Sequence, residues 1–134
     1  MGEVVKFVQH GAAHITPRIV ENLLHSLPLM KVEFAQFDAP EYPHLVDQLE
    51  FLADAVEDFA EGAYSDLPYN AVAAATFALM CAHKMIHAIP NFTPSVSHAD
   101  DSSVVRAVLI ENERAFAKYA AEQGIDWATI TCKA

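Results

Sequence analysis

The amino-acid sequence predicts an all-α protein, a small bundle of about four to five helices. Apolar residues recur at intervals of three and four along most of the chain, which is the spacing of one helix face. Capping residues, prolines and glycines punctuate these stretches where helices begin and end. With 134 residues and 53% hydrophobic content, the chain is expected to form a single helical domain over residues 1–134.

The first predicted helix begins at Thr16 and Pro17, because a capping hydroxyl followed by proline suits a helix start. We expect Pro28 to end it, since proline inside a helix removes a backbone hydrogen bond. Residues 31–37 alternate between apolar and polar types, so they fit either a short extended segment or another helical turn. The apolar face of the helix consists of Ile19, Val20, Leu23, Leu24 and Leu27.

A proline-rich connector at residues 38–43 precedes the clearest amphipathic helix of the chain. Gly62 is placed to end this helix in a left-handed conformation. The next helix opens at residues 65–68 and is apolar nearly all round over residues 71–82, which predicts a place in the middle of the bundle. The apolar face of the amphipathic helix consists of Leu45, Leu49, Leu52, Val56 and Phe59.

A proline-rich loop at residues 90–99 separates the last two long helices. Asp100 or Asp101 is positioned to cap the final helix, and Gly124 to end it. Trp127 and Ile130 are expected to fold back onto the bundle. The predicted buried stripe of the final helix consists of Val104, Val105, Val108, Leu109, Phe116 and Tyr119.

The charge balance argues against several classes of partner. Eighteen Asp and Glu residues stand against eight Lys and Arg residues, which gives a formal net charge of −10. Such a chain repels nucleic-acid phosphates and anionic lipid surfaces. The longest uncharged run, residues 67–83, is too short and too polar to span a membrane. With two cysteines and no secretory signal pattern, the chain is expected in the cytoplasm.

Residues 43–61 carry six carboxylates and no basic residue. Like charges three or four residues apart on a helix cost about 0.2 to 0.5 kcal/mol each. A basic protein partner or bound cations could offset this repulsion, although a solvated acidic face is the commoner case. We expect any homo-oligomer or protein partner to use this acidic helix. The acidic residues are Asp47, Glu50, Asp54, Glu57, Asp58 and Glu61.

A cluster of polar residues at the last interhelix loop could carry chemistry. His83 and His87 are four residues apart and share a helix face, and the loop leads to His98, Asp100 and Asp101. We identify His83, His87, His98 and Asp101 as a candidate site for zinc or another divalent ion. Alternatively, the aspartates are ordinary helix caps, or one of them pairs with His87 and locks the hairpin. In that last case the folded pKa of His87 lies above its unfolded value.

Other chemical signals are weaker. His10 and His14 also have the four-residue spacing, but Gly11 lies between them and surface decoration is the simpler interpretation. Cys81 fits a small core residue. The sequence has no glycine-rich phosphate loop, nucleophile elbow or Cys-x-x-Cys motif, which disfavours an enzyme of a familiar class.

The residues 85–101, MIHAIPNFTPSVSHADD, carry a family resemblance. They are similar to the pattern P-x-D-x-I-P-D-x-x-P-x-x-G-x-x-D-D of the YkvA-like bacterial domain of unknown function, and the resemblance extends over residues 67–119. The positions that agree are Ile89, Pro90, Pro94, Asp100 and Asp101. The positions that depart are Met85, His87, Asn91 and Ser97.

The resemblance implies an all-helical fold with a polar cluster of His87, Asn91, Asp100 and Asp101, and it supplies no activity. Because His87 and Asn91 replace aspartates, a structural lock or a softer metal is favoured over a calcium-like site. The leading hypothesis is therefore a non-enzymatic interaction or structural module that self-associates through an exposed apolar helix face. The alternative is a divalent-metal-binding protein, conceivably a metal-dependent hydrolase.

Overall fold

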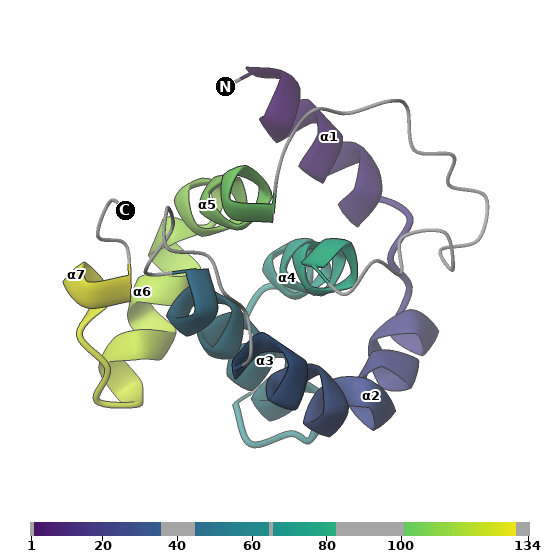
Figure 1. Cartoon of the computed structure of the whole chain (residues 1–134). Coiled ribbons are helices and arrows are strands. Elements are labelled where there is room, and N and C mark those ends of the chain that lie inside the picture. The colour runs from purple at the N-terminus through teal and green to yellow at the C-terminus, as the bar shows by residue number, and fades with distance from the viewer. Residues whose placement is uncertain (1, 36–44, 65, 83–100, 131–134) are drawn as a thin grey trace.

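The computed structural model of the chain describes residues 2–35, 45–64, 66–82 and 101–130, and within these ranges all regular structure is helical (Figure 1). The all-α class is confirmed. The described ranges hold seven helical segments rather than four to five, since the N-terminus is helical, the last long helix is divided and the tail forms a short helix. The segments are α1 (Gly2–Ala12), α2 (Pro17–Ala35), α3 (Leu45–Ala60), α4 (Tyr69–Ala82), α5 (Asp101–Glu111), α6 (Glu113–Glu122) and α7 (Trp127–Ile130). The predicted loop at residues 90–99 lies outside the described residues.

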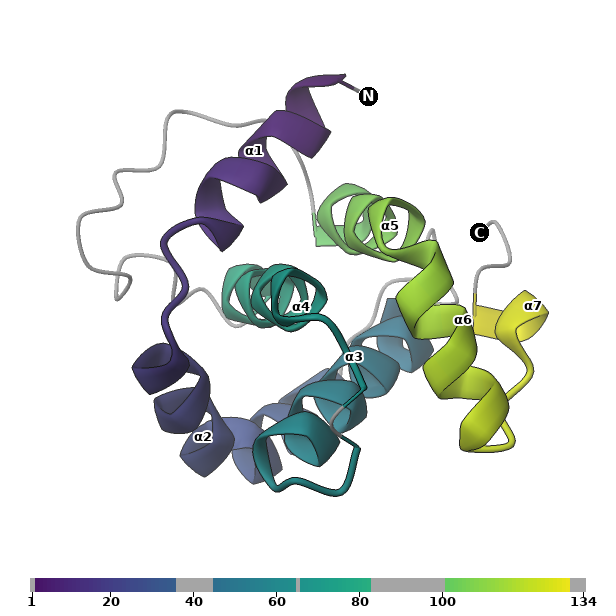
Figure 2. The same cartoon turned by 180° about the vertical axis from the view of Figure 1, so that it is seen from behind.

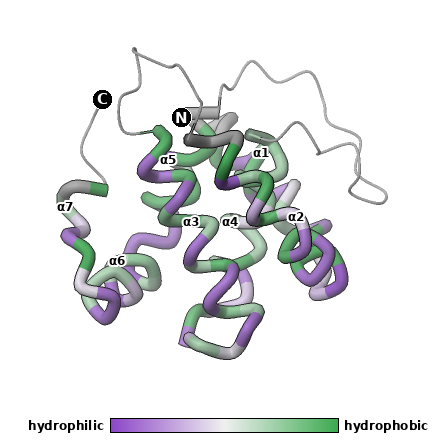
Figure 3. Tube along the Cα trace, turned by 60° about the horizontal axis from the view of Figure 1, so that its bottom comes forward, coloured by the Kyte–Doolittle hydropathy of each residue, from purple (hydrophilic) through white to green (hydrophobic). Residues whose placement is uncertain are grey.

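Helix α4 lies in the centre of the bundle, as its all-round apolar sequence predicts. Figure 1 shows it surrounded by α1, α2, α3 and α5. Every residue from 71 to 80 is buried, including Thr76, whose hydroxyl donates a hydrogen bond to the Val72 carbonyl at 2.8 Å. The peripheral helices contain both hydrophilic and hydrophobic residues, and Figure 3 shows the two kinds side by side along α2 and α6. No helix in the described ranges combines the length and apolar character needed to cross a membrane.

The prediction that Pro28 ends a helix is wrong, because α2 continues through it to Ala35. Pro28 is exposed, whereas Leu27 and Met30 on the opposite face of the same turn are fully buried. A proline inside a helix costs about 3 kcal/mol, whereas burying a Leu or Met side chain contributes about 1.5 to 3 kcal/mol each. Packing therefore outweighs the lost backbone hydrogen bond. The helical alternative for residues 31–35 is confirmed.

The predicted final helix is divided at Asn112 into α5 and α6, and Figure 2 shows α6 leaving α5 in a new direction. The Asn112 side-chain amide donates a hydrogen bond to the Val108 carbonyl at 3.0 Å, and such bonds compete with the helix ladder. All six residues of the predicted stripe are buried nevertheless. Gly62 adopts φ of 79°, which confirms the predicted left-handed end of α3, and Gly124 follows the end of α6 with φ of 73°.

The C-terminal segment folds back onto α3, as predicted. The Gln48 side-chain amide donates a hydrogen bond to the Ile130 carbonyl at 2.9 Å, and both residues are buried. The rings of Phe51 and Trp127 lie with centroids 5.8 Å apart. The contact joins residues 82 positions apart in the chain and holds α7 against α3.

Candidate functional site

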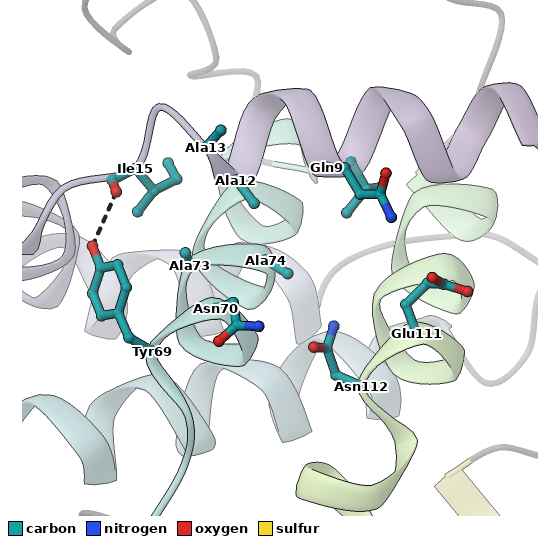
Figure 4. A pocket seen from close by; sticks show the side chains of 11 residues that line it. Gln9, Ala12, Ala13, Ile15, Tyr69, Asn70, Ala73, Ala74, Glu111 and Asn112 are labelled. Atoms are coloured by element: carbon teal, nitrogen blue, oxygen red, sulfur yellow. Dashed lines mark hydrogen bonds between the residues drawn. The ribbon is translucent and has the colours of Figure 1, made fainter.

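A pocket of about 470 Å³ lies between α1, the start of α4 and the end of α5 (Figure 4). Its volume is within the range of small-molecule sites in proteins. Apolar residues form its floor and walls, and polar side chains stand at its opening. The lining residues are Val8, Gln9, Ala12, Ala13, Ile15, Tyr69, Asn70, Ala73, Ala74, Glu111 and Asn112.

The floor of the pocket is hollow because its side chains are small. Helix α1 approaches α4 closely at Gly11, where an added Cβ atom would come within 2.1 Å of the Phe77 ring. Beyond this contact the facing residues are alanines, among them Ala12 on α1 and Ala74 on α4. The close approach closes one end of the gap, and the alanines leave the remainder open.

Tyr69 forms an aromatic wall held in place by its hydroxyl. The hydroxyl donates a hydrogen bond to the Ile15 carbonyl at 3.0 Å, drawn as the dashed line in Figure 4. Burial raises the pKa of Tyr69, so the phenol stays a neutral donor at physiological pH. The bond links the first turn of α4 to the segment between α1 and α2.

Four polar side chains from three different regions of the chain meet at the opening. In Figure 4, Gln9 points from α1 toward the side of the pocket where Glu111 and Asn112 lie, with Asn70 opposite Asn112. The Asn112 amide nitrogen is engaged by Val108, which leaves its carbonyl oxygen as an acceptor. Glu111 is exposed and adds a carboxylate. One side of the opening therefore offers two hydrogen-bond acceptors, the Asn112 carbonyl and the Glu111 carboxylate. The Gln9 and Asn70 amides stand at its other sides, above an apolar floor.

Two tyrosine–carboxylate pairs lie elsewhere and connect helices. The Tyr119 hydroxyl donates to Asp58 at 2.5 Å, and the Tyr64 hydroxyl donates to Glu122. Burial and the hydrogen bond to Asp58 raise the pKa of Tyr119 well above its ordinary value. Because both phenols are neutral donors to carboxylates, and the two pairs join α6 to α3 and to the turn that follows α3, we interpret them as structural contacts.

Tyr64 should ionise late in an alkaline titration. Burial first, then the hydrogen bond to Glu122, raises the pKa of Tyr64 from 10.0 to about 12. Because the folded pKa exceeds the unfolded one, this contribution to stability is complete below pH 10 and is lost as the pH rises through 12. Urea unfolding across this range should show a smaller loss for Tyr64→Phe than for the parent, and parallel losses would contradict the assignment.

The acidic face of α3 is partly neutralised from within the chain. Lys31 of α2 contacts Asp54 at 2.8 Å and Glu57 at 3.0 Å. These bonds raise the pKa of Lys31 even though its burial acts in the opposite direction. Asp58 accepts the Tyr119 hydroxyl. Three of the six predicted carboxylates thus have partners inside the bundle, so the repulsion alone does not require an external partner.

Most of the predicted polar cluster lies outside the described residues, namely His83, His87, Asn91, His98 and Asp100. Asp101 is the first residue of α5, but the position of its side chain is not described either. Among the described residues, no group of three His, Cys, Asp or Glu side chains could hold a metal ion. The metal site and the hairpin lock therefore stay predictions.

The other sequence candidates lie on the surface or against the core. His14 donates a ring N–H to the His10 carbonyl at 2.9 Å, and the two rings lie 4.9 Å apart between centroids. This local contact agrees with the interpretation of His10 and His14 as surface residues. Cys81 is partly buried and packs against the core, as expected for a small core residue.

No family model, curated protein or solved structure matches this chain. The resemblance to the YkvA-like domain stays a prediction, since residues 85–100 of its motif lie outside the described residues.

Proposed function

We propose that this chain is a non-enzymatic helical interaction module that associates with a second copy of itself through the outward face of α2. One observation carries the proposal. Leu29 and Val32, three residues apart on this face, are 60% and 55% exposed. Pro28 and His25 are exposed beside them, so the two aliphatic side chains form a small apolar surface.

The charge distribution supports a second copy as the partner. Helix α2 contains two basic and two acidic residues, whereas α3 contains five carboxylates and no basic residue. In a chain with a formal charge of −10, two copies meet with least repulsion where the local charge is balanced. Lys31 is turned toward α3, and the face of α2 that carries Leu29 and Val32 is apolar and less acidic than α3, so a symmetric dimer would place this face against itself.

The expected association is weak. Two aliphatic side chains cover far less area than a stable dimer interface, for which each partner contributes about 800 Å². A dissociation constant of roughly 0.1 to 1 mM is in keeping with such a patch. Weak association of this kind suits a module that dimerises while further contacts within a larger assembly raise the overall affinity.

Sedimentation velocity over a concentration series tests the proposal. We expect the parent protein to show a concentration-dependent shift toward dimer, and the double variant Leu29→Lys/Val32→Lys to remain monomeric. Ile110→Lys is the matched control, since Ile110 is a 51% exposed aliphatic residue on α5. The proposal fails if the parent is monomeric up to roughly 1 mM, or if Ile110→Lys disrupts the dimer equally.

The divalent-metal alternative, with His83, His87, His98 and Asp101 as ligands, predicts a different result. Protein purified without a metal-affinity tag would contain one equivalent of metal, and a chelator would lower its melting temperature strongly. Elemental analysis and melting with and without chelator separate this alternative from self-association.

A further inference from the structure

We propose that the pocket between α1, α4 and α5 binds a small organic cation, an alkylammonium group carried on a short hydrocarbon chain. None of the described residues that line this pocket belongs to α2, so the inference is independent of the association through that helix.

The first argument is the charge at the opening. Of the lining residues in the described ranges, Glu111 is the charged one, and no described residue forms an ion pair with it. A cation that enters the pocket can therefore pair with Glu111 without breaking an ion pair between described residues. The negative charge of the whole chain also raises the local concentration of cations.

The second argument is the arrangement of hydrogen-bond acceptors. The Asn112 side-chain nitrogen donates to the Val108 carbonyl, so the Asn112 side-chain oxygen is left to accept a hydrogen bond from a ligand. Figure 4 shows the amide groups of Gln9 and Asn70 on other sides of the opening, where rotation about the last side-chain bond would present the carbonyl oxygen to a ligand. An ammonium group has three donors and no acceptor, and it can satisfy several of these oxygens together.

The third argument is the apolar floor. Ala12, Ala73 and Ala74 leave space behind the polar opening, bordered by Val8 and Ile15. A short alkyl chain can enter this space and remove apolar surface from water while its charged end stays at the opening. Small inorganic cations would leave the floor unfilled, and a neutral hydrocarbon would leave Glu111 unpaired.

The test compares n-pentylammonium with its neutral analogue 1-pentanol, monitored by the amide NMR signals of the full chain. We expect n-pentylammonium to shift the side-chain amide signals of Gln9, Asn70 and Asn112, with a dissociation constant of roughly 1 to 10 mM. It should bind about three- to tenfold more tightly than 1-pentanol at low salt, and added salt should reduce this preference.

Two pairs of variants locate the effect. Glu111→Gln should abolish the preference for the cation, while Glu113→Gln, an exposed glutamate just beyond the pocket, should retain it. Ala74→Leu should weaken both ligands by filling the floor, while Ala121→Leu on the exposed side of α6 should not. If Ala74→Leu does not fold, the glutamate pair still decides the matter.

The inference is overturned if the two ligands bind equally, or if both glutamate variants lose the preference to the same extent. Shifts confined to the acidic face of α3 would also overturn it, because the cation would then follow surface charge alone.

Discussion

Replacing Phe51 with alanine should lower the free energy of unfolding by about 3 to 5 kcal/mol, the usual cost of truncating a buried aromatic residue. Phe51 is 3% exposed and lies at the centre of an aromatic cluster. Its ring centroid is 5.5 Å from that of Tyr119, 6.0 Å from that of Phe116 and 5.8 Å from that of Trp127. The substitution removes the shared partner of α6 and α7.

Urea unfolding followed by circular dichroism measures the loss, and the fluorescence of Trp127 reports whether α7 stays docked. Phe59→Ala is the matched control, because Phe59 lies on the same helix and is only partly buried. We expect its cost to be about 1 to 2 kcal/mol, with Trp127 fluorescence unchanged before unfolding. Equal losses for the two variants would show that the cluster is not the main contact between α3 and the C-terminal segment.

The helices whose packing follows local periodicity could be predicted from sequence. Leu45, Leu49, Leu52 and Val56 are buried in α3, and α4 is buried all round. The sequence also predicts that Trp127 and Ile130 fold back onto the bundle, although it does not identify Phe51 and Gln48 of α3 as their partners. In α3 and α4 the apolar pattern of neighbouring residues determines which side chains are buried, so a short stretch of sequence is enough to predict it.

The errors occurred where distant residues decide the outcome. Proline chemistry predicts an end at Pro28, but the burial of Leu27 and Met30 against the rest of the bundle sustains α2. The helical spacing of apolar residues continues on both sides of Asn112, so it does not predict the division between α5 and α6. The side-chain hydrogen bond from Asn112 to Val108 lies at this division. Local rules give the intrinsic preference, and tertiary packing outweighs it when the burial is large enough.

The pocket was not predicted from sequence for the same reason. Gln9, Asn70 and Glu111 are each unremarkable polar residues in their own helices, and only the packing of three helices brings them together. The signal closest to a clue is Gly11, a glycine inside the apolar N-terminal stretch. A glycine within a helix often marks a close approach of another element. Its partner, Phe77, is 66 positions away, so the sequence alone could not identify it.

Gly11→Ala should destabilise the protein, although alanine is intrinsically the better helix former by about 1 kcal/mol. The new Cβ atom would lie 2.1 Å from Phe77 Cε1 and 2.3 Å from its Cζ, both well inside van der Waals contact. The Phe77 ring is fully buried and packs edge-on against Phe7 at 5.2 Å, so it has little room to move. Overpacking of this kind typically costs about 1 to 3 kcal/mol, and the separation of α1 from α4 can raise it further.

A double-mutant cycle with Phe77→Leu distinguishes this clash from a general effect on α1. Leucine at position 77 removes the ring atoms that Cβ would meet, so Gly11→Ala should cost at least about 1 kcal/mol less in that background. Gln9→Ala, an exposed α1 substitution on the same helix, should change stability by less than about 0.5 kcal/mol. Additive effects of Gly11→Ala and Phe77→Leu would contradict the contact. A stabilising Gly11→Ala would mean that α1 does not pack on α4 at this distance, and the hollow beside it would then lose its closed end.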